Sequence, residues 1–93
     1  MEFEWDLSKE WVNVRKRGVT FSEAVESFFD PHGFQLVDVK HSRQEGRFYW
    51  VGKSETGRVP TTRFTRRGQK IRIIGSAEWR KFRRLYDETT KSK

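Results

Sequence analysis

Two strand-like segments joined by a glycine turn constrain the fold of this chain more than any other feature. Residues 58–65 and 69–74 have the residue pattern of strands, and Gly68 between them can make a tight turn. Ser76 can then cap a helix, whose packing stripe would consist of Trp79, Phe82 and Tyr86. The sequence therefore predicts a β-hairpin that runs directly into a helix.

The first third of the chain predicts two helices. Asp6 can cap the first helix and Gly18 can end it in the left-handed conformation. Its apolar stripe is expected to be Leu7, Trp11 and Val14. Thr20 opens a capping box for the second helix, with the stripe Phe21, Ala24, Val25 and Phe28. Residues 3–5 form either a short strand or an extended lead-in.

Strands are expected to follow the helices. Residues 34–39 and 47–53 are predicted to be strands, and Pro60 suits the beginning or the edge of the next one. Short loops between neighbouring strands favour antiparallel pairing. The polar end, residues 89–93, is expected to fray. The fold class is therefore α+β, as one domain over residues 1–93: two N-terminal helices, a small antiparallel sheet of about four strands and a C-terminal helix.

Positive charge is concentrated in the hairpin and the last helix. Residues 58–93 hold 12 Lys and Arg against 3 Asp and Glu, whereas residues 1–57 hold 8 against 10. Basic charge gathered on ordered elements favours a polyanion as partner, most commonly nucleic acid. The absence of cysteine excludes thiolate chemistry, and no apolar run is long enough to span a bilayer. We expect a cytoplasmic protein that has no membrane partner and needs no cofactor.

Strand alternation predicts which cations share a face. If Ile71 and Ile73 point into the core, Lys70 and Arg72 point the other way, and Arg63 on the partner strand joins them. On one interpretation these side chains grip phosphates, with Arg favoured for its two-pronged geometry. On the other they are solvated outer positions of a half-exposed sheet.

The basic surface extends to the turn and the last helix. Arg66 at the turn is a further candidate RNA-binding residue, and Arg80 at the start of the helix is a candidate catalytic one. Trp79 can stack on a base, although large aromatic side chains are more often buried in the core.

His41 is the candidate proton carrier because histidine titrates near neutral pH. A loop histidine can equally be a plain surface residue. Asp38 and Glu45 flank it, but one histidine with two loosely spaced carboxylates does not predict a metal site.

Short motifs follow one another along nearly the whole chain: Phe3-Glu-Trp-Asp6, Arg17-Gly-Val19, Phe21-Ser-Glu-Ala24, Phe29-Asp-Pro31, Asp38 with His41-Ser42, Glu45 with Arg47-Phe48, Arg63-Phe-Thr65, Ile71-Arg-Ile-Ile-Gly75, and Ala77 with Trp79-Arg80. In their order and spacing, these motifs resemble the BrnT family of bacterial toxins. The resemblance implies a fold similar to the RelE-like ribonuclease toxins and an RNA-degrading activity. It also implies a ribbon-helix-helix antitoxin, through whose complex alone the toxin meets operator DNA.

The chain departs from the resembled pattern at one position. Family members usually read Lys-His-Gly-Val where this chain has Lys16-Arg17-Gly18-Val19. If that histidine is catalytic in the family, the replacement removes it, whereas if it only caps or packs, Arg17 is a benign change.

The sequence thus predicts a metal-independent endoribonuclease toxin with Arg63, Arg80 and His41 as catalytic residues. Lys70, Arg66, Arg72 and Trp79 would bind the RNA. The alternative is a basic module that binds nucleic acid or an antitoxin and cuts nothing.

Overall fold

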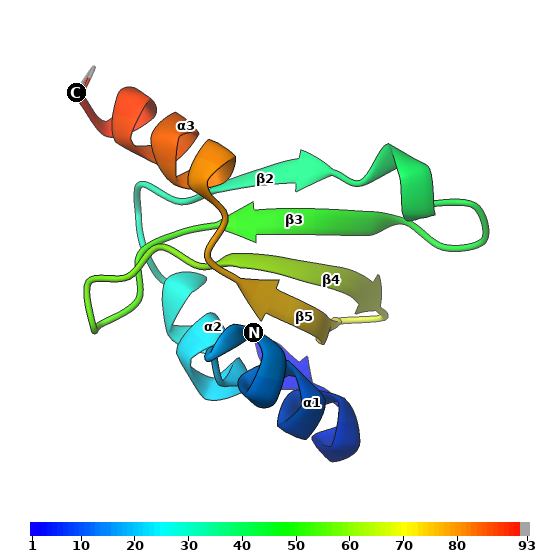
Figure 1. Ribbon diagram of the computed structural model, residues 1–93. Coiled ribbons are helices and arrows are strands. Elements are labelled where there is room, and N and C mark those ends of the chain that lie inside the picture. The colour runs from blue at the N-terminus through cyan, green and yellow to red at the C-terminus, as the bar shows by residue number, and fades with distance from the viewer. Residues whose placement is uncertain (92–93) are drawn as a thin grey trace.

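The computed structural model describes residues 1–91, which form three helices around one sheet (Figure 1). Along the chain the elements are β1 (Glu2–Glu4), α1 (Leu7–Arg17), α2 (Phe21–Ser27), β2 (Phe34–Val37), the 3₁₀ turn η1 (Val39–His41), β3 (Arg47–Val51), β4 (Thr61–Arg67), β5 (Lys70–Ala77) and α3 (Arg80–Lys91). Of the tail expected to fray, residues 89–91 belong to α3, and residues 92–93 lie outside the described part.

The sheet has five strands in the order β1-β5-β4-β3-β2, and it is mixed. Strands β2 to β5 form the predicted antiparallel meander, but β1 pairs parallel to β5, with Phe3 beside Ile71. The expectation of about four antiparallel strands was therefore wrong, because it omitted β1, a fifth strand that pairs in parallel at the edge of the sheet. Its partner lies almost seventy residues away, and the three-residue segment itself carries no sign of that pairing.

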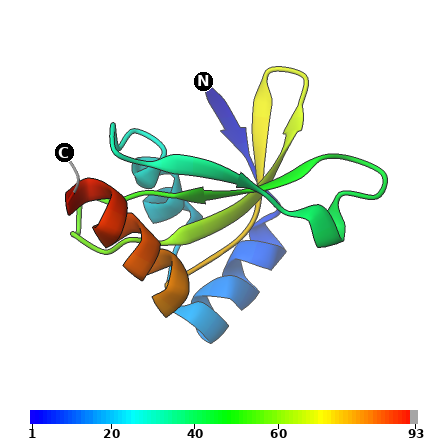
Figure 2. The same ribbon diagram turned by 90° about the horizontal axis from the view of Figure 1, so that it is seen from above.

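The two faces of the sheet are covered differently. Helix α2 packs on one face, where Phe21, Phe28 and Phe64 are buried with Ile71 and Ile73. On the other face α3 covers the β2–β3 side through Tyr86, Phe82, Val51 and Val59. Figure 2 shows α1 and α3 on this same side of the sheet. The middle of this face lies between them, and it carries the charged side chains described below.

Helix α1 contradicts its predicted packing stripe. Leu7 is 76% exposed and Trp11 is 62% exposed, and no residue of the helix is buried. The helix is held by polar groups instead. Asn13 bonds through its amide to both the backbone N–H and the carbonyl of Ser76, and Glu10 accepts from the N–H of Phe21. The apolar residues do recur at helical spacing, but the helix packs its polar face, with Asn13, against the edge of β5. The apolar stripe therefore faces solvent.

Helix ends were predicted with mixed success. The Thr20 hydroxyl accepts from the backbone N–H of Glu23, as the capping pattern requires. Ser76, by contrast, does not cap α3, because it lies inside β5 with its hydroxyl 2.9 Å from that of Thr62. Strand β5 continues to Ala77 because Thr61 pairs with it there, and α3 begins three residues later.

An ion pair between the buried Glu23 and the partly exposed Arg58 joins α2 to the loop before β4. Glu23 is only 8% exposed and accepts bonds from Ser54, Thr56 and the guanidinium of Arg58. Arg58 also donates to the carbonyl of Gly18. These donors, Arg58 first, lower the pKa of Glu23 from 4.5 to about 2.

Replacement of Glu23 should expose this contribution to stability. Because the folded-state pKa lies below the ordinary value, the stabilisation is complete above about pH 5 and is lost as pH falls toward 2. We expect Glu23→Gln to lower the free energy of unfolding by about 2–3 kcal/mol at neutral pH, with a flatter dependence at acid pH. Urea unfolding at a series of pH values measures both. If the free energy of unfolding depended on pH in the same way for the variant and the wild type, the role assigned to Glu23 would be contradicted.

Candidate functional site

Arg63 lies at the centre of the open face, on β4 between Tyr49 of β3 and Gly75 of β5. Its guanidinium lies over Gly75, with Nη2 3.5 Å from the position that a β-carbon there would take. The side chain is half-buried, and among residues 1–91 it has no ion pair or hydrogen bond. A guanidinium carries five donors, so this one is free to bind an anion.

Cations from α1 surround Arg63. A hollow of about 440 Å³ between α1 and the sheet is lined by Lys9, Lys16 and Arg17 together with Arg63, and no carboxylate lines it. These lysines and Arg17 project from the helix face opposite the exposed Trp11. Four cations in a hollow without a carboxylate in its lining give a positive field that would attract phosphates.

Asp38, His41 and Ser42 form a hydrogen-bonded group at the β2–β3 loop. Asp38 is 4% exposed, and its carboxylate lies 2.9 Å from Nδ1 of His41. The turn η1 folds His41 back onto Asp38, and the Ser42 hydroxyl donates to the Asp38 carbonyl. An ionised carboxylate only accepts, so the neutral tautomer of His41 that fits this contact donates from Nδ1 and leaves Nε2 as the acceptor.

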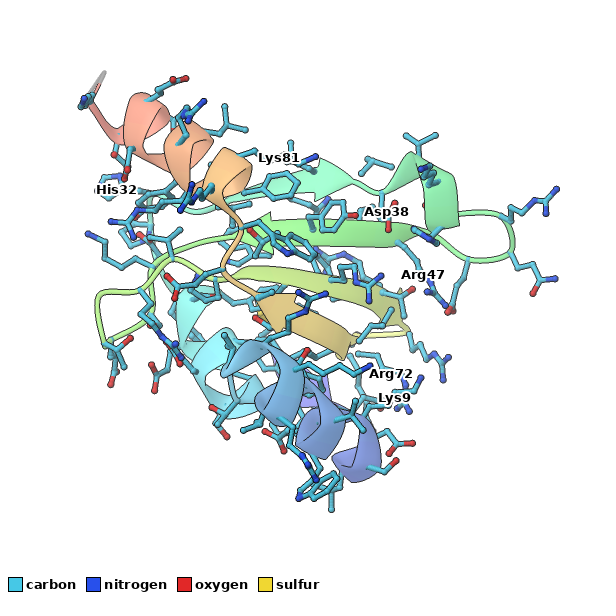
Figure 3. All side chains as sticks on the ribbon, viewed as in Figure 1. Lys9, His32, Asp38, Arg47, Arg72 and Lys81 are labelled. Carbon is cyan, nitrogen blue, oxygen red and sulfur yellow. The ribbon has the colours of Figure 1, made fainter. Side chains whose placement is uncertain are left out.

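Tyr49 links this pair to Arg63. Burial raises the pKa of Tyr49, the charge of Asp38 and a hydrogen bond to it add to the rise, and Arg63 opposes it. Since each of these effects requires closeness, Asp38, Tyr49 and Arg63 form one electrostatic cluster. In Figure 3 Asp38, which follows β2, lies next to Arg47 at the start of β3, and the Asp38 N–H donates to the Arg47 carbonyl.

Trp79 combines the two roles weighed for it. Its ring meets Tyr49 edge-on at 6.2 Å and lies 5.9 Å from Phe82, which is core packing. It also lines a narrow hollow with Arg17 and Arg63. The ring is half-buried, so one edge stays available beside the cations.

The other predicted cations are not free beside Arg63. Arg72 shares its face but bonds to Glu4 at 2.8 Å, and Lys70 lies 3.8 Å from the same carboxylate. Arg66 lies on the opposite face, over the ring of Phe64 and bonded to Gln35. Arg80 lines a separate hollow along α3 with Arg83, Asp87 and others. Glu4 reaches these cations because β1 pairs with β5, and that pairing was not predicted from the sequence.

The sequence missed several residues of this site. Lys9 and Lys16 of α1 were not among the predicted site residues, although the spacing of Lys9, Lys16 and Arg17 puts them on one face of the helix. Arg47 was noted only as part of a motif. Asp38 was considered as a metal ligand, although its place three residues before His41 also fits a hydrogen-bonded turn.

Residues 1–91 contain no group of three or more side chains suited to bind a metal ion. In this part of the chain no helix is both long and apolar enough to cross a membrane.

Comparison with known proteins identifies the family. The family model described as "Ribonuclease toxin, BrnT, of type II toxin-antitoxin system" matches residues 5–82. This chain belongs to the BrnT family. Such a ribonuclease toxin acts on RNA and has an antitoxin as partner, and the matched region contains His41, Arg63, Trp79 and Arg80.

Structural comparison agrees with this assignment. The fold matches the 1.1 Å crystal structure of the Brucella abortus ribonuclease toxin BrnT with a TM-score of 0.64. The match covers 85% of this chain and 96% of that one at 20% identity, so it shows a common fold. No curated protein sequence matches this chain.

The cluster around Tyr49 can be tested by titration. We expect Asp38→Asn to lower the pKa of Tyr49, because a negative charge leaves, and Arg63→Ala to raise it further, because a positive charge leaves. Phenolate absorbance follows the titration, and Tyr49→Phe identifies its phase. Tyr86, whose burial and bond to Asp30 raise its pKa to about 12, serves as the internal control. If the pKa of Tyr49 shifted in the same direction in both variants, the proposed cluster of Asp38, Tyr49 and Arg63 would be contradicted.

Proposed function

We propose that this BrnT-family chain cleaves RNA without a metal ion, through attack of the 2′-hydroxyl on the neighbouring phosphorus. One observation carries the proposal: Arg63 is a half-buried guanidinium with no partner of its own, surrounded by further cations. A group of this kind stabilises the charge that grows on a five-coordinate phosphate, commonly the largest contribution to such catalysis.

The proton transfers fall to the neighbouring side chains. Nε2 of His41 can take the proton of the 2′-hydroxyl while the 2′-oxygen bonds to phosphorus and the bond to the 5′-oxygen breaks. The leaving 5′-oxygen then takes a proton from a nearby acid, for which Tyr49 or a lysine is available. The products are a 2′,3′-cyclic phosphate and a 5′-hydroxyl. The catalytic role predicted for Arg80 stays a prediction.

The remaining parts of the proposal rest on the resemblance of the sequence motifs to the family pattern. The cognate antitoxin would be a ribbon-helix-helix protein with an acidic segment that covers the basic face, and operator DNA would be reached only through their complex. Activity in the cytoplasm and kinship with the RelE-like ribonuclease toxins belong to the same proposal.

A binding module that cuts nothing is the second candidate, and Arg17 is the observation that favours it. Where the resembled family pattern has histidine, Arg17 lines the hollow beside Arg63. The replacement adds a cation and leaves no histidine in that hollow. If proton transfer took place there, the chain would still bind RNA but would not cleave it.

Cleavage of ribosome-free RNA in EDTA tests the proposed activity. We expect the wild type to cleave and Arg63→Ala to lose at least about 100-fold in rate, because one preorganised donor to the transition state is removed. End-group analysis should find 2′,3′-cyclic phosphates.

Arg66→Ala is the matched control, since it removes the same charge from the opposite face of the sheet. It should retain most of the activity. Equal losses in both variants, or products with 3′-hydroxyl and 5′-phosphate ends, would refute the mechanism. Binding of RNA with no cleavage by any form would support the binding module.

A further inference from the structure

A second unpaired arginine lies on the same face as Arg63. Arg47 begins β3 and pairs in register with Thr65, two residues along β4 from Arg63. Diagonal neighbours of this kind lie roughly 7–8 Å apart in a sheet. Like Arg63, the Arg47 side chain is half-buried and, within residues 1–91, makes no ion pair or hydrogen bond.

The fold uses the backbone of Arg47 but not its side chain. The Arg47 N–H donates to the Ser42 hydroxyl, and its carbonyl accepts from the N–H of Asp38. These bonds close the loop that carries His41. Other half-buried arginines have structural partners: Arg58 bonds to Glu23, and Arg72 to Glu4. The Arg47 guanidinium therefore has no structural role that explains its burial.

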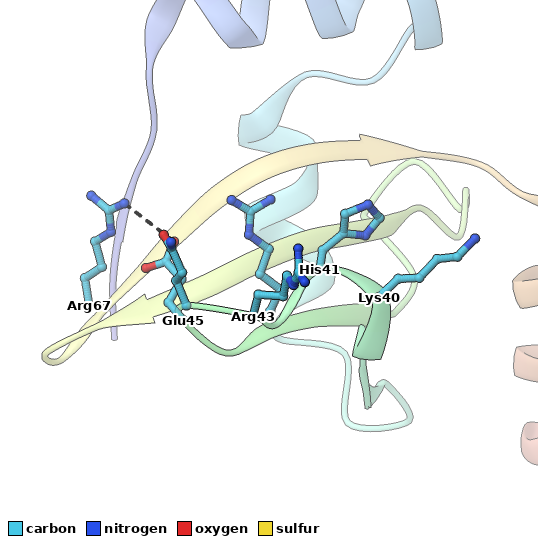
Figure 4. A pocket seen from close by; sticks show the side chains of 7 residues that line it. Lys40, His41, Arg43, Glu45 and Arg67 are labelled. Atoms are coloured by element: carbon cyan, nitrogen blue, oxygen red, sulfur yellow. Dashed lines mark ion pairs between the residues drawn. The ribbon is translucent and has the colours of Figure 1, made fainter.

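Arg47 lines a hollow of about 560 Å³ under the β2–β3 loop. Lys40, Arg43 and Arg67 line it as well, and so does His41 (Figure 4). Glu45 is the one carboxylate in the lining, and it pairs with Arg67 at 3.7 Å. Lys40, Arg43 and Arg47 keep their charge uncompensated, beside the histidine that we assign to proton transfer.

Two separate cationic hollows thus lie on one face, with Tyr49 and Asp38 between them. The first holds Arg63 and the cations of α1, and the second holds Arg47 and the cations of the loop. A phosphate bound at Arg63 would leave Arg47 and the cations of the loop without an anion of their own. A strand of nucleic acid repeats its charge along its length and exposes its bases to an aromatic edge such as Trp79.

We propose that Arg47 binds a second phosphate of single-stranded RNA, next to the one cleaved at Arg63. The strand then runs from the α1 hollow past Tyr49 into the hollow under the β2–β3 loop. The placement of the cleaved phosphate rests on the proposed function, whereas the binding of a strand across both hollows does not.

Binding of non-cleavable oligonucleotides tests this path. The probes are fully 2′-O-methylated RNAs, a dinucleotide and an octanucleotide, with affinity measured by fluorescence anisotropy at several salt concentrations. We expect Arg47→Gln to weaken octanucleotide binding about tenfold and to reduce the salt slope by about one. Binding of the dinucleotide should change little, because it reaches only one hollow.

Arg66→Gln is the control, because it removes an equal charge from the opposite face. Equal weakening by Arg47→Gln and Arg66→Gln would overturn the proposal, since it would indicate general attraction alone. The proposal would also be overturned if Arg47→Gln weakened binding of the dinucleotide and of the octanucleotide by the same factor. Binding of an acidic polyglutamate peptide but of no octanucleotide would overturn it too, and would assign the face to a protein partner.

Two further readouts separate this inference from the proposed function. Arg47→Lys keeps the charge but loses the fork of donors, so its affinity should fall between wild type and Arg47→Gln. Unfolding curves of both variants should match the wild type, because the side chain makes no bond in the fold. If the wild type binds the octanucleotide through Arg47 but cleaves no RNA, the proposed function fails and the binding path stands.

Discussion

The alternation of side chains along β4 is the constraint on which both the core and the site depend. Phe64 points to the face covered by α2, so Arg63 on one side of it must point to the other. A register irregularity between these two residues places Gly75 opposite Arg63, and the missing side chain leaves room for the guanidinium. One strand therefore both fills the core and presents the cation at the centre of the open face.

Sequence periodicity was sufficient to predict this part of the structure. The meander, the cap at Thr20 and the outward direction of Arg63 all follow from patterns within one or two neighbouring elements. Contacts between distant segments could not be read in that way. Pairing of β1 with β5 and the Asn13 bonds to Ser76 join residues more than sixty positions apart, and no local pattern encodes them.

These distant contacts decide which cations remain available. Glu4 arrives with β1 and pairs with Arg72 and Lys70, two residues that the charge pattern alone marked as binding residues. Asn13 holds α1 against β5, so Lys9 and Arg17 line the hollow of Arg63. The net charge of +7 shows only that a polyanion would be attracted. The location of the site depends on which of these charges lack a partner.

Buried charge is treated differently at Glu23 and on the open face. The fold surrounds Glu23 with donors from Ser54, Thr56 and Arg58, and so compensates its loss of water. On the open face Arg63 and Arg47 are partly removed from water without compensation, which costs stability. A marginally stable domain of this size gains nothing from such an arrangement unless a ligand completes it. Anions of RNA meet that requirement at both arginines, and the exposed stripe of α1 on the opposite side of that helix takes no part in it.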